Sequence, residues 1–188
     1  MQSEFKQYAT KNDFSAAATT ESGKLAVASN KGDIRLFDQI GKNAKVRGSI
    51  HFRAAHQQTA LPALGDPIIG VDVSADGRWL VATCKTYLLL IDLLIGDGRY
   101  KGSLGFDRSF PADSKPIPRR LQLRPEHVAY MKNPVSFTPA KYVTYRRAYF
   151  SCLADGRFNT GPQETEKTII TSTGNYVVTC MLFAYAPA

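Results

Sequence analysis

Residues Ile68–Asp92 read IIGVDVSADGRWLVATCKTYLLLID and contain three apolar runs, Ile68–Val73, Arg78–Thr83 and Tyr87–Asp92. Runs of about six residues rich in valine, leucine and isoleucine have the length of β-strands and are too short for helices. Asp76-Gly77 separates the first two runs and predicts a tight turn, because glycine accepts a positive φ angle without steric cost. The stretch therefore predicts an antiparallel meander. Its runs are apolar at nearly every position, which is typical of strands buried between two neighbouring sheets.

The same pattern occurs earlier in the chain, in Phe14–Asp38, FSAAATTESGKLAVASNKGDIRLFD. This segment aligns with Ile68–Asp92 without a gap. The equivalent pairs include Gly23 and Gly77, Leu25 and Trp79, and Asp38 and Asp92. We interpret all four named positions of the repeat, Asp38, Gly77, Trp79 and Asp92, as structural. Trp79 is expected in the core, and each aspartate is expected to accept backbone N–H groups of the turn that follows its strand.

A third, partial copy covers residues 166–180, where Gly174 stands for Gly77 and Tyr176 for Trp79. Internal repeats of short strands and tight turns are typical of β-propellers, whose blades contain about 40–45 residues and whose rings contain four to eight blades. We therefore predict an all-β fold in which residues 1–188 form one partial propeller domain, with about two blades and a partial third. The chain is expected to be too short to close a ring. Its open sheet edges predict self-association or pairing with another chain.

Three segments lie between the repeats. Residues 46–58 and 142–156 are predicted to be irregular inserts, the first because it lacks strand or helix periodicity. Residues 101–139 form a long connection rich in proline and basic residues, which excludes a continuous helix. A short helical turn is predicted from Pro125 through Met131, because proline is favourable at a helix start.

The formal net charge of +8 and the isoelectric point near 9.5 favour anionic partners. The basic residues are scattered, and a solvated basic surface explains most of them. One cluster stands apart, and prolines on either side are expected to hold it extended and accessible. It contains Lys115, Arg119, Arg120 and Arg124. This segment is a candidate for docking to an acidic protein groove, a phosphoinositide head group or RNA.

The sequence contains no recognisable catalytic, cofactor-binding or metal-binding motif, so we predict a protein that is not an enzyme and needs no cofactor. His51 and His56 lie five positions apart, which does not match the spacing of a helical metal site. Asp72 lies inside an apolar run, where a carboxylate must find partners or shift its pKa. A hydrogen bond from a neighbouring backbone N–H explains it more simply than a functional buried acid.

The cysteines are Cys84, Cys152 and Cys180, an odd number at wide spacing, which favours free thiols in a reducing compartment. Residues 1–10 are polar and lack the apolar segment of a signal peptide. The longest apolar run, Tyr87–Ile95, contains Asp92 and is far shorter than the roughly 20 residues that cross a bilayer. We therefore expect a soluble cytoplasmic or nuclear protein, with cytoplasm preferred.

Four stretches resemble the C-terminal domain of the vacuolar import and degradation protein twenty-seven family. They are KGDIRLFDQIGKNAK (Lys31–Lys45), TALPALGDPIIGVDVSADGRWLVATCKTYLLLID (Thr59–Asp92), PRRLQL (Pro118–Leu123) and VSFTPAK (Val135–Lys141). The resemblance implies a WD40-like propeller in a eukaryotic, cytoplasmic protein. It also implies a non-catalytic role in targeting a gluconeogenic enzyme to the vacuole for degradation.

The chain departs from the family pattern at both predicted inserts and after Thr179, where the family continues into a tryptophan and a basic tail. The first insert opens with Val46 and closes with Gln58, whose codons could hold the GT and AG boundaries of an intron. We therefore hypothesise that the inserts and the tail are translated introns. On that hypothesis the chain could be a truncated gene product without function.

The leading expectation is a protein-interaction scaffold in vacuolar import and degradation, with a protein partner. The alternative is a basic module that binds nucleic acid or anionic lipid, and it depends on charge alone. A steep dependence of binding on salt concentration would distinguish that alternative.

Overall fold

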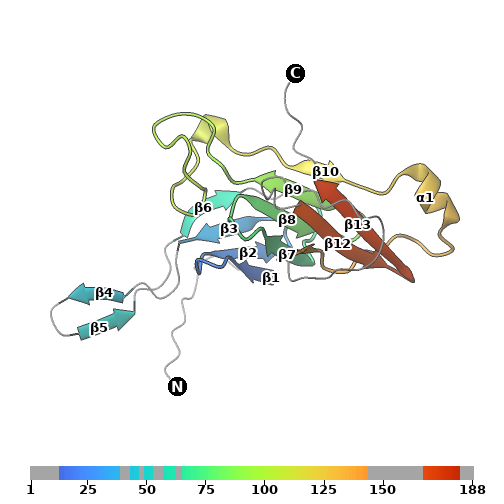
Figure 1. Ribbon diagram of the computed structural model, residues 1–188, viewed down its shortest axis with the longest axis horizontal. Coiled ribbons are helices and arrows are strands. Elements are labelled where there is room, and N and C mark those ends of the chain that lie inside the picture. The colour runs from blue at the N-terminus through green and yellow to red at the C-terminus, as the bar shows by residue number, and fades with distance from the viewer. Residues whose placement is uncertain are drawn as a thin grey trace, which may run out of the picture.

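The computed structural model describes residues 13–38, 43–46, 49–52, 57–61, 65–143 and 167–182. Most strands in this part belong to three antiparallel sheets (Figure 1). The first sheet contains β1 (Phe14–Thr19), β2 (Leu25–Ser29), β3 (Ile34–Phe37) and β6 (Gln57–Leu61), in that order. The second contains β7 (Gly70–Val73), β8 (Trp79–Thr83), β9 (Leu88–Asp92) and β10 (Arg119–Leu121), in that order. The third contains β11 (Lys141–Val143), β12 (Lys167–Thr173) and β13 (Tyr176–Leu182).

The repeat predicted from the sequence is confirmed. Strands β2 and β8 begin and end at equivalent positions of the two copies, and each is the second strand of its sheet. In both sheets three consecutive strands form a meander, and a later segment adds the fourth strand. The predicted all-β partial propeller of antiparallel meander sheets is therefore correct.

The turn glycines explain why both copies fold alike. Gly23 and Gly77 have φ angles of +79° and +72°, values that residues with a Cβ atom rarely adopt. The N–H of Gly77 donates to the carbonyl of Ser74 at 2.8 Å, and the N–H of Gly23 donates to the carbonyl of Thr20 at 3.0 Å. Each glycine therefore closes the turn between the first and second strands of its sheet.

The third copy is displaced by one hairpin from the predicted alignment, so the match of Gly174 to Gly77 was wrong. Strand β11 pairs with β12 and lies against β7, the first strand of the second sheet. Strands β12 and β13 are therefore the second and third strands of their sheet. Gly174, with a φ of +55°, lies in the turn that corresponds to Cys84–Tyr87. In sequence, a glycine turn between two apolar strands looks the same whether it joins the first and second strands of a sheet or the second and third. The first strand of this sheet, β11, also lies far upstream of β12.

The predicted inserts differ from the expectation or lie largely outside the described residues. Strand β5 (Ser49–Phe52) and the start of β6 fall inside residues 46–58, where irregular structure was expected. Strand β5 pairs with β4 (Asn43–Val46) in a separate hairpin that projects at the left of Figure 1. Strands of four residues are too short to display a clear alternation of polar and apolar positions. Of residues 142–156, only Tyr142 and Val143 are described, at the end of β11.

The long connection between β9 and β11 contains regular elements in addition to β10. A short 3-10 helix, η1, covers Ala112–Ser114, and helix α1 covers Pro125–Tyr130. The helical turn predicted from Pro125 is thus confirmed, and proline occupies its first turn. The connection follows the edge of the second sheet and then reaches the third.

The second sheet is buried on both faces, as its apolar strands predicted. Leu80, Ala82 and Ile91 belong to the core cluster shared with the first sheet. Val81 and Leu90 belong to a second cluster, which includes Ile169 of the third sheet and partly buried Trp79. Successive residues of a strand point to opposite faces, so β8 divides its side chains between the two neighbouring sheets.

The first strands of the sheets lie next to one another, β1 against β7 and β7 against β11. The hydroxyl of Ser15 donates to the carbonyl of Ile68, which joins the first two sheets. The N–H of Ala140 donates to Oγ1 of Thr83 at 2.9 Å, which joins the second and third. A Cβ atom on Gly70 would lie 2.5 Å from Cβ of Pro139, so only glycine permits this approach.

Candidate interaction surfaces

The segment after β9, residues 93–110, is called the cross-sheet loop because it leaves the second sheet and packs on the first. Leu94 and Leu104 form an antiparallel bridge at its base. Phe106 is fully buried in the core cluster between the two sheets, and Phe110 is buried too. A Cβ atom on Gly105 would meet the Phe110 ring at 2.4 Å, so this position requires glycine. The loop is therefore part of the packed structure.

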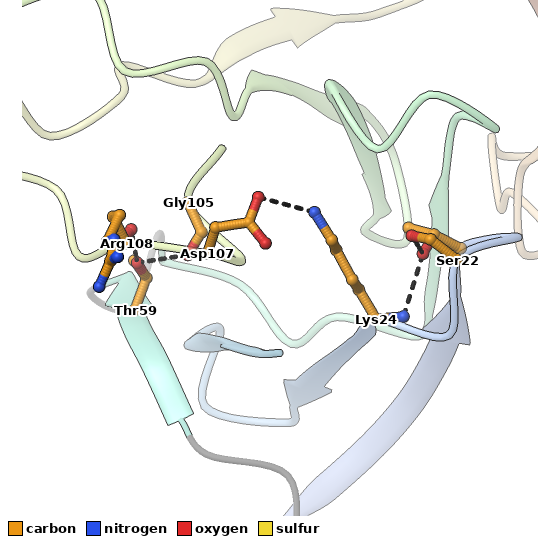
Figure 2. Close-up of polar contacts among 7 residues, drawn as sticks. Ser22, Lys24, Thr59, Gly105, Asp107 and Arg108 are labelled. Carbon is orange, nitrogen blue, oxygen red and sulfur yellow. Dashed lines mark hydrogen bonds and ion pairs between the residues drawn. The ribbon is translucent and has the colours of Figure 1, made fainter. Parts of the chain in front are cut away.

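Polar contacts fasten the cross-sheet loop to the first sheet (Figure 2). The hydroxyl of Thr59, on β6, donates to the carbonyl of Gly105 at 2.7 Å. Nζ of Lys24 lies 2.7 Å from Oδ2 of Asp107 and 6.0 Å from the centroid of the Phe106 ring. Because Asp107 is about half exposed, water screens this ion pair, and its contribution to stability is modest. These contacts therefore define where the loop lies on the first sheet. Their contribution to the free energy of unfolding is the smaller effect.

Arg99, Tyr100 and Arg108 form an arginine–tyrosine cluster at the surface of the cross-sheet loop. The guanidinium carbons of Arg99 and Arg108 lie 5.7 and 5.4 Å from the centroid of the Tyr100 ring. All three side chains are exposed. Cation–π contact with the ring restrains the two guanidinium groups. Our sequence interpretation missed this cluster, although Arg99-Tyr100-Lys101 places an aromatic residue between two basic ones.

The predicted basic segment runs from η1 through β10, the outer strand of the second sheet, to the start of α1. Arg119 and Arg120 lie on β10 and pair with Leu90 and Leu89 of β9. Lys115 follows η1, and Arg124 precedes α1. All four side chains are exposed, as the flanking prolines predicted. Neighbouring residues on a strand point to opposite faces, so Arg119 and Arg120 do not form one continuous surface. A docking role for this segment stays a prediction.

Arg120 also has a structural contact, because its guanidinium carbon lies 4.0 Å from the centroid of the buried Tyr87 ring. Burial of Tyr87, together with hydrogen bonds to Cys84 and Asp66, raises its pKa to about 12. Burial also raises the pKa of the Cys84 thiol, which keeps it protonated near neutral pH. Arg120 therefore contacts buried residues at the edge of the second sheet.

Asp92 lies where the sequence placed it, at the end of the third strand. Its Oδ1 accepts the backbone N–H of Leu94 at 3.0 Å, and its Oδ2 lies 3.0 Å from Nη2 of Arg78. The hydrogen bond to Asp92 raises the pKa of Arg78. The same guanidinium lies 5.3 Å from the Trp79 ring, on the side of the second cluster. Asp38 follows β3 and is half-buried.

Asp72 joins the second and third sheets. Its Oδ2 accepts the backbone N–H of Tyr142 at 2.8 Å, and Lys141 Nζ lies 3.4 Å from Oδ1. Burial and the Asp72 charge raise the pKa of Tyr142. A backbone N–H partner is the simpler of the two interpretations that the sequence allowed. Asp72 is thus positioned to hold β11 against β7.

Three exposed apolar side chains lie on α1 and at the start of β13, where these two elements approach each other. The group is called the apolar patch, and its members are Val128, Tyr130 and Tyr176. The exposed fractions of Tyr130 and Tyr176 are 83% and 40%. The hydroxyl of Tyr176 donates to the carbonyl of Tyr130 at 3.4 Å, so the two elements lie side by side. Clustered apolar side chains on a surface are typical of sites that bind another protein.

Residues 1–184 match the model of the VID27 C-terminal WD40-like domain. The chain belongs to this family. The domain description agrees with the stacked meander sheets, and it confirms the resemblance inferred from the four quoted stretches.

Two relatives extend the VID27 assignment. The chain is 55% identical over 179 residues to Vacuolar import and degradation protein 27 of Schizosaccharomyces pombe, covering 93% of the chain and 19% of the relative. It is 43% identical over 183 residues to the protein of the same name from Saccharomyces cerevisiae, covering 95% and 20% respectively. The chain therefore spans about a fifth of the length of these relatives.

The described part of this VID27 domain contains no group of three or more His, Cys, Asp or Glu side chains arranged to hold a metal ion. Within the same residues, no helix is long and apolar enough to cross a membrane. Cys84 and Cys180 are both free thiols.

Proposed function

We propose that this chain is a protein-interaction scaffold that acts in vacuolar import and degradation without catalysis. The apolar patch carries the proposal, because its side chains are exposed and lie on two elements that the packing of the domain positions. Protein interfaces are enriched in tyrosine and other large side chains, whose burial provides most of the binding free energy. The names of the two relatives support the pathway. The partner is proposed to be another protein of the pathway that carries cargo from the cytoplasm to the vacuole.

The test uses the full-length relative of Saccharomyces cerevisiae, in which the matching segment is replaced by this chain. Tyr130→Ser and Tyr176→Ser are introduced together, and Ile117→Ser serves as the matched control. Ile117 is an equally exposed apolar residue, 87% accessible, outside the patch. The measurement is the rate at which the gluconeogenic enzyme is degraded in the vacuole, by pulse-chase.

We expect the patch variant to slow degradation several-fold and the control to leave it unchanged. Tryptophan fluorescence of the isolated variants checks that both remain folded. Equal degradation in the patch variant and the unsubstituted protein would contradict the proposal. The proposal would also be contradicted if the relative that carries this chain, without any substitution, supported no degradation of the enzyme.

Binding of anionic lipid or nucleic acid is the alternative function of the basic segment around β10, because Lys115, Arg119 and Arg124 are exposed and have no ion pair among the described residues. Anionic lipid or nucleic acid would then bind with an affinity that falls steeply with salt. Vesicle and RNA binding measured over a salt series distinguishes this function from the scaffold. The hypothesis of translated introns is tested separately, by sequencing transcripts across residues 46–58 and 142–156.

A further inference from the structure

The arginine–tyrosine cluster on the cross-sheet loop is more ordered than a solvated basic surface needs to be, because its charged groups pack on an aromatic ring. Two guanidinium groups, from Arg99 and Arg108, are held near one aromatic ring. A guanidinium packed on a ring keeps its N–H groups available at the edge of its plane, where carboxylates bind in a bidentate manner. The Tyr100 ring reduces the side-chain motion that binding would otherwise have to arrest.

The backbone that carries the cluster is fixed by hydrogen bonds. The N–H of Ile95 donates to Ser103 at 2.9 Å, and the N–H of Gly102 donates back to Ile95 at 2.8 Å. Arg108 is held at the other end, because its N–H donates to Leu104 at 3.1 Å. Its carbonyl, in turn, accepts from the Thr59 hydroxyl at 3.4 Å. The two arginines are thus mounted on one ordered loop, with Arg108 beside β6 (Figure 2).

The cross-sheet loop contains three basic residues, Arg99, Lys101 and Arg108, and two acidic ones, Asp97 and Asp107, so its net charge is positive. No ion pair among the described residues involves Arg99 or Arg108, and the nearby carboxylate of Asp107 is engaged by Lys24. Lys101 adds a third exposed cation next to Tyr100. A site with preorganised donors and unbalanced positive charge attracts anions.

We propose that the arginine–tyrosine cluster binds side-chain carboxylates of an acidic peptide segment in a partner protein. This surface is formed by residues other than those of the apolar patch, so either proposal can fail alone. Binding adds one bidentate carboxylate contact at each guanidinium, and the acidic segment lies across the Tyr100 ring.

The size of the cluster favours a peptide over the other polyanions. Nucleic acids need a longer basic track, which contacts several phosphates, and single strands also stack on more than one aromatic side chain. Anionic membranes are recognised by clusters of about four to eight basic residues close to the bilayer. Two restrained guanidinium groups on a single ring match two carboxylates of a short peptide.

The test measures fluorescence anisotropy of a labelled peptide with a run of glutamates, titrated with the full 188-residue chain. A matched peptide with glutamines in place of the glutamates controls for charge. The variant Arg99→Ala/Arg108→Ala removes the cluster, and Arg119→Ala/Arg124→Ala removes the same charge from the basic segment around β10. Arg99→Lys/Arg108→Lys keeps the charge but lacks the planar fork.

We expect the glutamate peptide to bind and the glutamine peptide not to bind. The alanine pair in the cluster should weaken binding about ten-fold or more, the lysine pair less, and the Arg119/Arg124 pair no more than about two-fold. Three results would overturn the proposal. They are absence of glutamate-peptide binding at low salt, equal losses in the two alanine pairs, and binding of RNA or phosphatidylserine vesicles through Arg99 and Arg108 without peptide binding. All variants are exposed-residue substitutions, and unchanged tryptophan fluorescence confirms their fold.

Discussion

Phe106→Ala tests whether the cross-sheet loop is an integral part of the core. The Phe106 side chain is fully buried in the cluster between the first and second sheets. A buried phenylalanine removes about 150 Å² or more from water, which at about 25 cal/mol per Å² corresponds to ~4 kcal/mol. Measured costs of such truncations, which also leave a cavity, are about 3–5 kcal/mol. We therefore expect the free energy of unfolding to fall by ~4 kcal/mol.

The assay is urea unfolding followed by the fluorescence of Trp79, the single tryptophan of the chain. With a slope of about 2 kcal/mol per M, the loss corresponds to a decrease of about 2 M in the midpoint. Phe106→Leu removes less buried surface and should lower the midpoint less. If the alanine variant is largely unfolded without urea, the midpoint of the leucine variant provides the measurement instead. Tyr100→Ala is the control on the same loop, because Tyr100 is exposed. A change below about 1 kcal/mol for Phe106→Ala would refute the packing of this loop between the sheets.

Three further predictions concern the sheets. Asp72→Ala should lower the free energy of unfolding by roughly 1–3 kcal/mol, because it leaves the N–H of Tyr142 without its acceptor; a urea midpoint equal to that of the unsubstituted chain would argue against this contact. Gly77→Ala should cost about 1 kcal/mol or more because of its φ of +72°, whereas Gly96→Ala, with no neighbour within 4 Å, should cost much less; equal urea midpoints would count against the turn geometry. The raised pKa of Tyr87, about 12, means that the folded state holds this proton more tightly than the unfolded chain. The stability that results is complete below pH about 10 and is lost as the pH rises toward 12, so Tyr87→Phe should flatten the fall in urea midpoint over this range. An identical alkaline profile in the variant would show that Tyr87 has no such role.

The two complete repeats could be predicted from the sequence because their signals are local. Six-residue apolar runs and a glycine that needs a positive φ define the strands around Gly23 and Gly77 wherever they occur. The third copy was recognised but aligned to the wrong hairpin. Its first strand, β11, is separated from β12 by a long segment, and pairing between distant segments leaves no local pattern. The β4–β5 hairpin was missed because its strands are short.

The surfaces were harder to predict than the sheets. Lys115, Arg119, Arg120 and Arg124 are close in sequence and were found, but the alternation of β10 directs Arg119 and Arg120 to different faces. Arg108 approaches Tyr100 only because Leu94 and Leu104 pair at the base of the loop. In the same way, Tyr130 meets Tyr176 only after the third sheet has formed. Each of these contacts depends on tertiary folding, and no spacing in the sequence encodes it.

Methyl–methyl nuclear Overhauser effects in the isotopically labelled chain test the stacking of the sheets most directly. Leu80 should show contacts with methyl groups of the first sheet, such as Ile34 or Leu36, because it belongs to their core cluster. Its neighbour Val81 should instead share its contacts with Ile169 of the third sheet. Contacts from both Leu80 and Val81 to the same sheet, or to neither, would contradict a second sheet that is buried between the other two.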